Sequence, residues 1–211
     1  MVSEHAAIWK FAQESVVEPE HIARARQHAL ELGAEPIAAS VGSQIAVLAA
    51  ASGARSIVEI GTGAGVSGLW LLHGAPNAVL TTIDSEPEHL AVARQAFHDA
   101  RIPLARTRFI TGRAASVLPR MNEASYDLVL IDADRENVIE YVEHGLRLAR
   151  AGGTVLVPRA LHDGRVADPV QRDDVTRALR SLIQETQRSP AVIAALSIVG
   201  DGLLQLTKVT A

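Results

Sequence analysis

The sequence predicts an α/β fold in which a mostly parallel, seven-stranded sheet is doubly wound, with helices on both faces. Short apolar runs rich in β-branched residues alternate with helix-length segments along most of the chain. One run, at residues 57–60, leads directly into a turn with three alternating glycines. The last two runs, at residues 192–199 and 203–208, are joined by only three residues. Such a short connection cannot hold a crossover helix, so these strands must form an antiparallel hairpin.

The elements can be assigned in chain order from their periodicity and from the Pro and Gly residues that bound them. A first helix, capped by Ser3 and reaching about residue 17, carries Trp9 and Phe11, which we expect to pack under it or against a second subunit. Further helices are predicted within residues 19–33, 43–51, 66–73, 87–100, 136–149 and 173–187. Strands are predicted at residues 57–60, 79–84, 107–110, 126–131, 154–157, 192–199 and 203–208.

Length and composition indicate one compact domain over residues 1–211, with a helical extension at 1–35 and a core at 36–211. The 211 residues, 48% of them hydrophobic, can bury a full sheet between two helix layers. The net charge of -4 is mild and its signs are interspersed, which argues against nucleic-acid binding. Apolar runs too short for a membrane span, no recognisable signal peptide and no cysteine together favour a cytoplasmic protein without a membrane role.

The glycine turn allows the backbone to approach a ligand closely, and three readings of it compete. Gly63, Gly65 and Gly68 fit the G-x-G-x-x-G pattern of a dinucleotide site. The alternative E-x-G-x-G-x-G is typical of an S-adenosylmethionine site, in which an acid before the first glycine faces the cationic methionine end. Glu59 occupies that position. The third reading is a turn that only packs a helix on a strand.

Two later segments support an adenosine ligand without choosing between the cofactors. Asp84 ends the second strand about twenty residues beyond the glycines, where a carboxylate can accept hydrogen bonds from both ribose hydroxyls. Each such bond contributes about 1.5 to 3 kcal/mol. Ala114 and Ala115 follow the third strand and either leave room for a flat adenine or simply begin a helix.

The carboxyl end of the fourth strand carries Asp132 and Asp134. Ligands bind at this edge of an open parallel sheet, so we expect these acids to belong to the site. The C-terminal hairpin then favours the S-adenosylmethionine reading of the glycine turn. A mostly parallel sheet that ends in an antiparallel hairpin is the arrangement of class I methyltransferases, whereas dinucleotide-binding domains end differently.

From about residue 36 to 209 the chain resembles the S-adenosylmethionine-dependent O-methyltransferase family that includes catechol and caffeoyl-CoA methyltransferases, especially its small bacterial members. The matching motifs are residues 58–67, Thr82-Ile83-Asp84, Ile131-Asp132-Ala133-Asp134, and Gly152-Gly153 before the fifth strand. The resemblance implies a class I, Rossmann-like methyltransferase fold, S-adenosylmethionine as cofactor, and a homodimer.

The resemblance also implies roles for individual residues. Glu59, the backbone of Gly61, Thr62 and Gly63, and Ser67 would hold the methionine end of the cofactor. Asp84 would bind the ribose and Ala114 would lie beside the adenine, while Val41 would lie against the cofactor and Asp132 near the reacting sulfonium.

The departures from the family concern its metal. In the family an Asp-Asn pair at the end of the fifth strand binds a divalent cation together with the first acid of Asp-x-Asp; here Pro158 and Arg159 stand there. Proline offers no side-chain ligand and a guanidinium repels a cation, so we predict no metal. The family's lysine is replaced by Arg135. An arginine stays protonated in proteins, so it cannot act as a general base.

Without the metal, the acceptor oxygen still has to lose a proton. We hypothesise that Arg159 stabilises the acceptor's phenolate or anchors its carboxylate. His162 or Asp132 would then accept the proton, although His162, which stands where many relatives have a tryptophan, can equally be an exposed loop residue.

The favoured function is therefore metal-independent transfer of a methyl group from S-adenosylmethionine to a hydroxyl of a small-molecule acceptor. Two alternatives stay open at this point. One is a non-catalytic protein that binds S-adenosylmethionine, and the other is a nicotinamide-dependent oxidoreductase. The sequence does not identify the acceptor.

Overall fold

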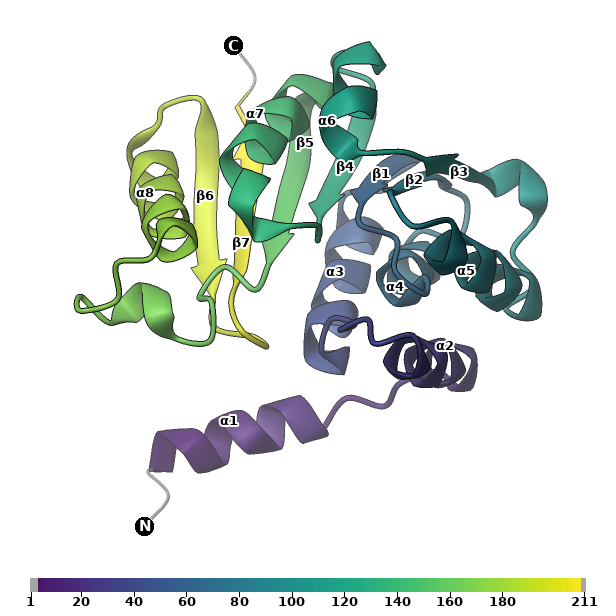
Figure 1. The fold of residues 1–211 in the computed structure, drawn as a ribbon, viewed down its shortest axis with the longest axis horizontal. Helices are drawn as coiled ribbons and strands as arrows, with labels where there is room; N and C mark the ends of the chain where they lie inside the picture. Colours follow the sequence, from purple (N-terminus) through teal and green to yellow (C-terminus); the bar gives the residue numbers. More distant parts are fainter. Residues whose placement is uncertain (1–3, 210–211) are drawn as a thin grey trace.

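The computed structural model describes residues 4–209, which fold around one seven-stranded sheet (Figure 1). The strands are β1 Ser56–Ile60, β2 Val79–Asp84, β3 Thr107–Thr111, β4 Tyr126–Ile131, β5 Ala149–Pro158, β6 Val192–Ser197 and β7 Leu203–Lys208. Their order is β3-β2-β1-β4-β5-β7-β6. The first five strands pair in parallel, and β7 runs antiparallel to both β5 and β6. The predicted fold class, including the C-terminal hairpin, is confirmed.

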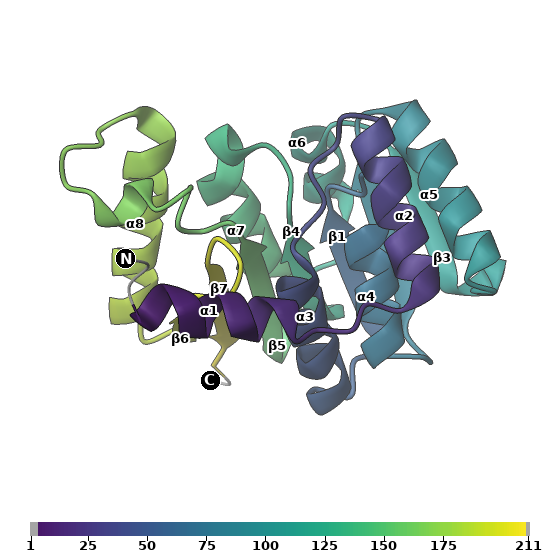
Figure 2. The ribbon, with the colours of Figure 1, turned by 90° about the horizontal axis from the view of Figure 1, so that it is seen from below.

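Helices cover both faces of the sheet (Figures 1 and 2). They are α1 Glu4–Glu14, α2 Glu20–Glu31, α3 Ala39–Ala51, α4 Val66–Gly74, α5 Pro87–Asp99, α6 Ala114–Val117, α7 Val138–Leu148 and α8 Asp174–Arg188, with short 3₁₀ helices at Leu104–Arg106, Leu118–Arg120, Arg135–Asn137 and Arg165–Ala167. One apolar layer joins α2 to α5 to the sheet, and a second joins α6 to α8 to its other face.

The parallel strands are buried because both of their faces are covered. Along β1, the fully buried Ile57 packs into the layer of α2 to α5, whereas Val58 and Ile60 pack into the layer of α6 to α8. Side chains alternate between the two faces of a strand, so the five residues of β1 contribute to both apolar layers. This burial fixes the direction in which β1 delivers the glycine turn.

The two largest differences from the predicted element boundaries are at the third helix and the fifth strand. The third helix begins at Ala39 rather than near residue 43, and Gly42 lies inside it. A Cβ on Gly42 would lie 2.2 Å from the indole of Trp70, so glycine here serves the close crossing of α3 and α4. The fifth strand begins at Ala149, ahead of Gly152 and Gly153, because the chain already pairs with β4 there before the register shifts.

Helix α1 lies apart from the sheet, below the end formed by β5, β7 and β6 (Figures 1 and 2). It contacts α3, and its side chains Ile8 and Phe11 are 62% and 75% exposed. Trp9 is also partly exposed. The predicted cap at Ser3 lies outside the described residues. Within the described part of the chain, no helix has the length and apolar character needed to cross a membrane.

Candidate active site

The glycine turn after β1 brings the ends of β1 and β4 into direct contact. Gly61 has a φ of +94°, and a Cβ there would lie 2.1 Å from the backbone oxygen of Asp132. The backbone N–H of Asp132 in turn donates to the oxygen of Ile60 at 2.8 Å. Only glycine meets both demands, left-handed backbone and close approach, at this position. The turn and Asp132 therefore border the same space.

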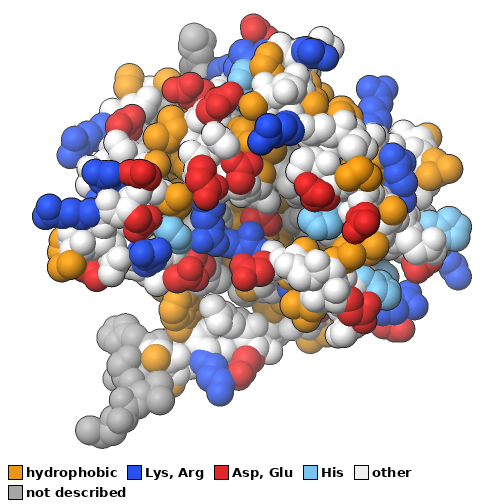
Figure 3. All heavy atoms as spheres, in the orientation of Figure 1, with side chains coloured by type: hydrophobic (Ala, Val, Ile, Leu, Met, Phe, Trp, Pro, Cys, Tyr) orange, Lys and Arg blue, Asp and Glu red, His pale blue; other side chains and the backbone are white. Residues whose placement is uncertain are grey.

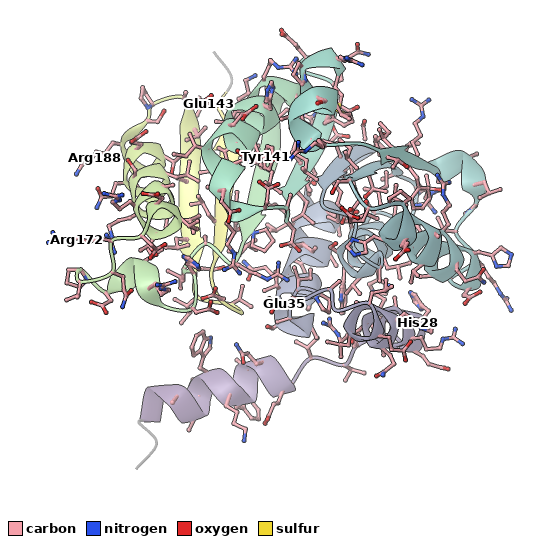
Figure 4. The ribbon with its side chains drawn as sticks, viewed as in Figure 1. His28, Glu35, Tyr141, Glu143, Arg172 and Arg188 are labelled. Carbon is pink, nitrogen blue, oxygen red and sulfur yellow. The ribbon has the colours of Figure 1, made fainter. Side chains whose placement is uncertain are left out.

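That space is a cavity of about 890 Å³ at the carboxyl edge of β1, β2 and β4. Several predicted site residues line it, namely Gly61, Thr62, Gly63, Ser67, Asp84, Ala114, Asp132 and Arg159. Glu35, from the segment before α3, and Tyr141, from α7, also line it and are labelled in Figure 4. Acidic and basic side chains are interspersed over the face of the molecule seen in Figure 3.

Glu59 is completely buried behind the cavity wall. Its carboxylate accepts hydrogen bonds from Ser67 Oγ and Thr82 Oγ1, both at 2.6 Å, and Thr82 Oγ1 is bonded to Thr62 Oγ1 at 2.6 Å. Burial raises the pKa of Glu59 to about 7, although these two hydrogen bonds act to lower it. Ser67 lines the cavity and Glu59 does not, so the Ser67 hydroxyl links the buried Glu59 carboxylate to the cavity lining.

Asp84 lies at the end of β2 and faces the turn. Its Oδ2 accepts the backbone N–H groups of Thr62 and Gly63 at 3.0 and 2.9 Å. Its Oδ1 accepts the N–H of Glu86 at 2.9 Å, and His89 Nδ1 lies 3.4 Å away. The carboxylate is thus oriented by the chain before any ligand arrives.

Asp132 and Arg159, predicted from separate strand ends, form an ion pair at the cavity. The Arg159 guanidinium donates to Asp132 Oδ1 and also to the backbone oxygen of Glu35. Burial raises the pKa of Asp132, even though the positive charges of Arg159 and Arg135 act to lower it. Arg159 has a φ of +56°, a left-handed conformation that is costly for a side chain with a Cβ. This backbone turns the guanidinium back towards β4.

Besides Glu59, two predicted residues do not line the cavity. His162 Nδ1 lies 3.2 Å from Thr176 Oγ1, on the side of α8. Val41 is buried on α3, and a Cβ added to Gly200 would meet its side chain at 2.5 Å. The structure therefore brings together Asp132 and Arg159 but not His162, and it buries Val41 on α3 beside the turn between β6 and β7.

Asp134 lines the cavity, as expected from its place after the fourth strand, whereas Asn137, Tyr141 and His89 line it without having been predicted as site residues. Asp134 accepts a hydrogen bond from Tyr141 Oη at 2.8 Å and another from Asn137 Nδ2. Burial, reinforced by the neighbouring Asp134, raises the pKa of Tyr141. Nothing local in the sequence distinguishes Tyr141 or His89 from other helix residues.

No group of three or more His, Cys, Asp or Glu side chains that could hold a metal ion is found among the residues that the structure describes. Asp132 instead faces a guanidinium, which is a donor and not a metal ligand. The absence of a catalytic metal stays a prediction.

Comparisons with known proteins agree with the geometry. The O-methyltransferase family profile matches residues 12–209. A probable O-methyltransferase of Mycobacterium tuberculosis is 47% identical over 199 residues, covering 94% of this chain and 89% of that protein. A crystal structure from Corynebacterium glutamicum superposes with a TM-score of 0.89 at 30% identity, covering 99% of both chains.

A further solved structure is the O-methyltransferase TomG of Streptomyces achromogenes in complex with S-adenosylmethionine. It superposes with a TM-score of 0.84 at 26% identity and covers 100% of both chains. The resemblance drawn from the sequence motifs is thereby confirmed, and the methyltransferase reading of the glycine turn is favoured over the dinucleotide reading. Because the family match covers nearly the whole chain, this protein belongs to the O-methyltransferase family.

Proposed function

We propose that this O-methyltransferase transfers the methyl group of S-adenosylmethionine to a hydroxyl of a small-molecule acceptor without a divalent metal. The observation that carries the proposal is the ion pair of Arg159 with Asp132, because the guanidinium occupies the strand end where relatives of this family have a metal ligand. When bound, the cofactor supplies an electrophilic methyl group on a sulfonium.

The described cavity fits this cofactor. Ser67 and the backbone of Gly61 to Gly63 would hold the methionine end, with Glu59 acting through the Ser67 hydroxyl. Asp84 would bind the ribose. Ala114 begins α6 and also lines the cavity. It would lie beside the adenine, so beginning a helix and leaving room for the adenine are compatible roles for this residue. Val41 would support the wall from behind.

The acceptor half of the site would work by orientation and charge. Holding the acceptor oxygen in line with the methyl group can lower the barrier by about 7 to 11 kcal/mol. Asp132, whose pKa burial raises, would accept the proton, and Arg159 would stabilise the oxyanion or anchor an acceptor carboxylate. His162 is the alternative proton acceptor, but its contact with Thr176 lies outside the cavity lining.

Methyl transfer from labelled S-adenosylmethionine in the presence of a chelator tests the proposal. We expect turnover to survive the chelator in the wild type. Arg159→Ala should lower kcat at least tenfold, while the affinity for S-adenosylhomocysteine changes little. Loss of turnover with the chelator and recovery with added Mg²⁺ would show that a metal is needed after all.

A second candidate is a protein that binds S-adenosylmethionine without catalysis. It is favoured by one observation: Arg159 already bonds both Asp132 and the oxygen of Glu35, which ties the proposed catalytic groups to the chain. Micromolar binding of S-adenosylhomocysteine with no transfer to any hydroxylated acceptor in a broad panel would favour this candidate.

We further propose that residues 1–211 act as a single cytoplasmic domain, with residues 1–35 extending the core at 36–211, and that the protein is a homodimer. The exposed side chains Ile8 and Phe11 support a second copy docking on α1. Light scattering should give the mass of two chains, and Phe11→Glu should shift the mass towards one chain. A single-chain mass for the wild type would contradict the dimer.

A further inference from the structure

The carboxylate of Asp84 has less free capacity than a ribose demands. Its oxygens already accept three backbone N–H groups, from Thr62, Gly63 and Glu86. A carboxylate offers about four lone-pair sites, so about one site, on Oδ1, is left for a ligand. A ribose presents two vicinal hydroxyls, and the second therefore needs another acceptor.

His89 lies beside the remaining site. It is in the first turn of α5, lines the same cavity, and its Nδ1 is 3.4 Å from Asp84 Oδ1. This contact is longer than a good hydrogen bond, so His89 Nδ1 can still form a hydrogen bond with a ligand. A neutral imidazole carries one lone pair on a ring nitrogen and can accept a hydroxyl proton. Two acceptors this close can both be reached by neighbouring hydroxyls.

We propose that His89 is a second ribose-binding residue of the cofactor site. Neutral His89 accepts a hydrogen bond at Nδ1 from one ribose hydroxyl, while Asp84 Oδ1 accepts one from the other. This assignment rests on the proposed function, since it takes the cavity to be the site of S-adenosylmethionine. The ligand class it selects is an adenosine derivative with an intact vicinal diol.

Only a neutral His89 can act in this way. A protonated His89 has no lone pair to offer, and as a cation it would pair with Asp84 and occupy the remaining site. Affinity should therefore fall in solutions acidic enough to protonate the ring. The other charged groups lining this end are Asp84, Glu86 and Arg113. Glu59, whose pKa burial raises to about 7, also takes up a proton on acidification, but it lies behind the methionine end.

The experiment therefore uses a probe without the methionine end. Calorimetric titrations with 5′-methylthioadenosine, and with its 2′-deoxy and 3′-deoxy forms, compare the wild type with His89→Leu at pH 8.0 and about pH 5.5, a window chosen around the imidazole range. We expect His89→Leu to bind the full diol about 3- to 10-fold more weakly at the higher pH, as for one lost hydrogen bond. His89→Gln, which keeps an acceptor oxygen, should recover most of the loss.

Two further results are expected. The difference between wild type and His89→Leu should vanish for the analogue that lacks the hydroxyl facing His89. The wild type should lose affinity at the lower pH, whereas His89→Leu should not. The matched control is His98→Leu, the same change at a 79% exposed side chain of the same helix, which should behave as the wild type.

Equal affinities of wild type and His89→Leu at the higher pH, or an unchanged loss of affinity at low pH in His89→Leu, would overturn the assignment. S-adenosylhomocysteine separates this failure from a failure of the proposed function. If the wild type binds S-adenosylhomocysteine normally, only the role of His89 is wrong. If the wild type binds neither that product nor 5′-methylthioadenosine, the cofactor site itself is wrong.

Discussion

Two acidic side chains lie at the ends of neighbouring strands, and the protein accommodates them in different ways. Glu59, in β1, is surrounded by neutral donors, the hydroxyls of Ser67 and Thr82. Asp132, just after β4, faces the positive charge of Arg159. Hydroxyls offset only part of the cost of burying a carboxylate, which is why the pKa of Glu59 reaches about 7.

Under the proposed function, this difference separates a cofactor half of the cavity, around Ser67 and Asp84, from an acceptor half, around Asp132 and Arg159. Around Glu59 the polar groups are buried, and their hydrogen bonds with one another orient the Ser67 hydroxyl. Around Asp132 the partner is a long side chain from a strained backbone position, and it also reaches the segment before α3. We therefore expect changes near Glu59 to alter stability and cofactor affinity, and changes near Asp132 to alter turnover.

The largest effect is expected at Gly61, which lies between the two acids. Gly61→Ala would place a methyl group 2.1 Å from the Asp132 oxygen at a φ of +94°, forcing the two strand ends apart. We expect a destabilisation of about 2 to 4 kcal/mol and more than a hundredfold loss of S-adenosylhomocysteine affinity. Denaturant unfolding measures the loss of stability, and calorimetry measures the loss of S-adenosylhomocysteine affinity.

Gly164→Ala is the matched control for this change. Gly164 has a φ of +76°, but a Cβ there meets nothing within 4 Å, so only the backbone cost applies. A Gly61→Ala protein no less stable than the Gly164→Ala protein would mean that the close approach of the strand ends has no energetic importance.

Turnover should fall next most at Asp132. Asp132→Asn keeps the shape but removes the charge and the proton acceptor, and it leaves Arg159 without its counterion. We expect kcat to drop about a hundredfold, with a smaller change in S-adenosylhomocysteine affinity. The control is Asp163→Asn, whose carboxylate is 78% exposed. Turnover of Asp132→Asn within threefold of the wild type would remove Asp132 from the mechanism.

Stability should depend on pH through Glu59. The folded-state pKa is raised from 4.5 to about 7, so its contribution favours folding below pH 4.5 and is lost as pH rises through 7. The wild type should therefore lose roughly 3 kcal/mol relative to Glu59→Gln between acid and alkaline conditions. Urea unfolding across this range checks the slope. The control is Glu143→Gln, at the exposed position labelled in Figure 4, whose free energy of unfolding should depend on pH as in the wild type. If Glu59→Gln also kept the wild-type pH dependence, Glu59 would not be its source.

The smallest effect is expected at His162. Since His162 contacts Thr176 and does not line the cavity, His162→Gln should change kcat by less than about threefold, within what one surface substitution produces. Methyl-transfer rates of the wild type and of His162→Gln, compared across about pH 6 to 9, provide the measurement. A tenfold loss would instead indicate that residues 159–165 move to bring His162 to the acceptor.

Much of the cofactor half was predictable because it depends on local sequence. Asp84 ends a strand, Gly61 directly follows one, and Ser67 lies in the first turn of the helix after the glycine turn, so the strand direction places all three at one edge. The exact role of Glu59 was not predictable in this way. Whether an acid touches a ligand or supports a hydroxyl depends on one side-chain layer, which periodicity does not resolve.

The acceptor half was less predictable because its contacts are distant in sequence. Arg159 donates a hydrogen bond to the backbone oxygen of Glu35, which lies 124 residues earlier. It does so from a left-handed backbone conformation that no local sequence pattern predicts. His162 follows Arg159 by three residues, yet the same turn directs it towards α8. Tyr141 joins the cavity through Asp134.

The sequence by itself determined the sheet, its terminal hairpin, the glycine turn, the family and the replacement of the metal ligands by Pro158 and Arg159. These features follow from strand periodicity and short motifs, whose geometry is local. Only the tertiary structure decided that Arg159 pairs with Asp132, that Glu59 lies behind Ser67, and that His89 stands beside Asp84. Such contacts depend on how separate elements pack, and burial and backbone strain are settled only once the sheet and its helices are assembled.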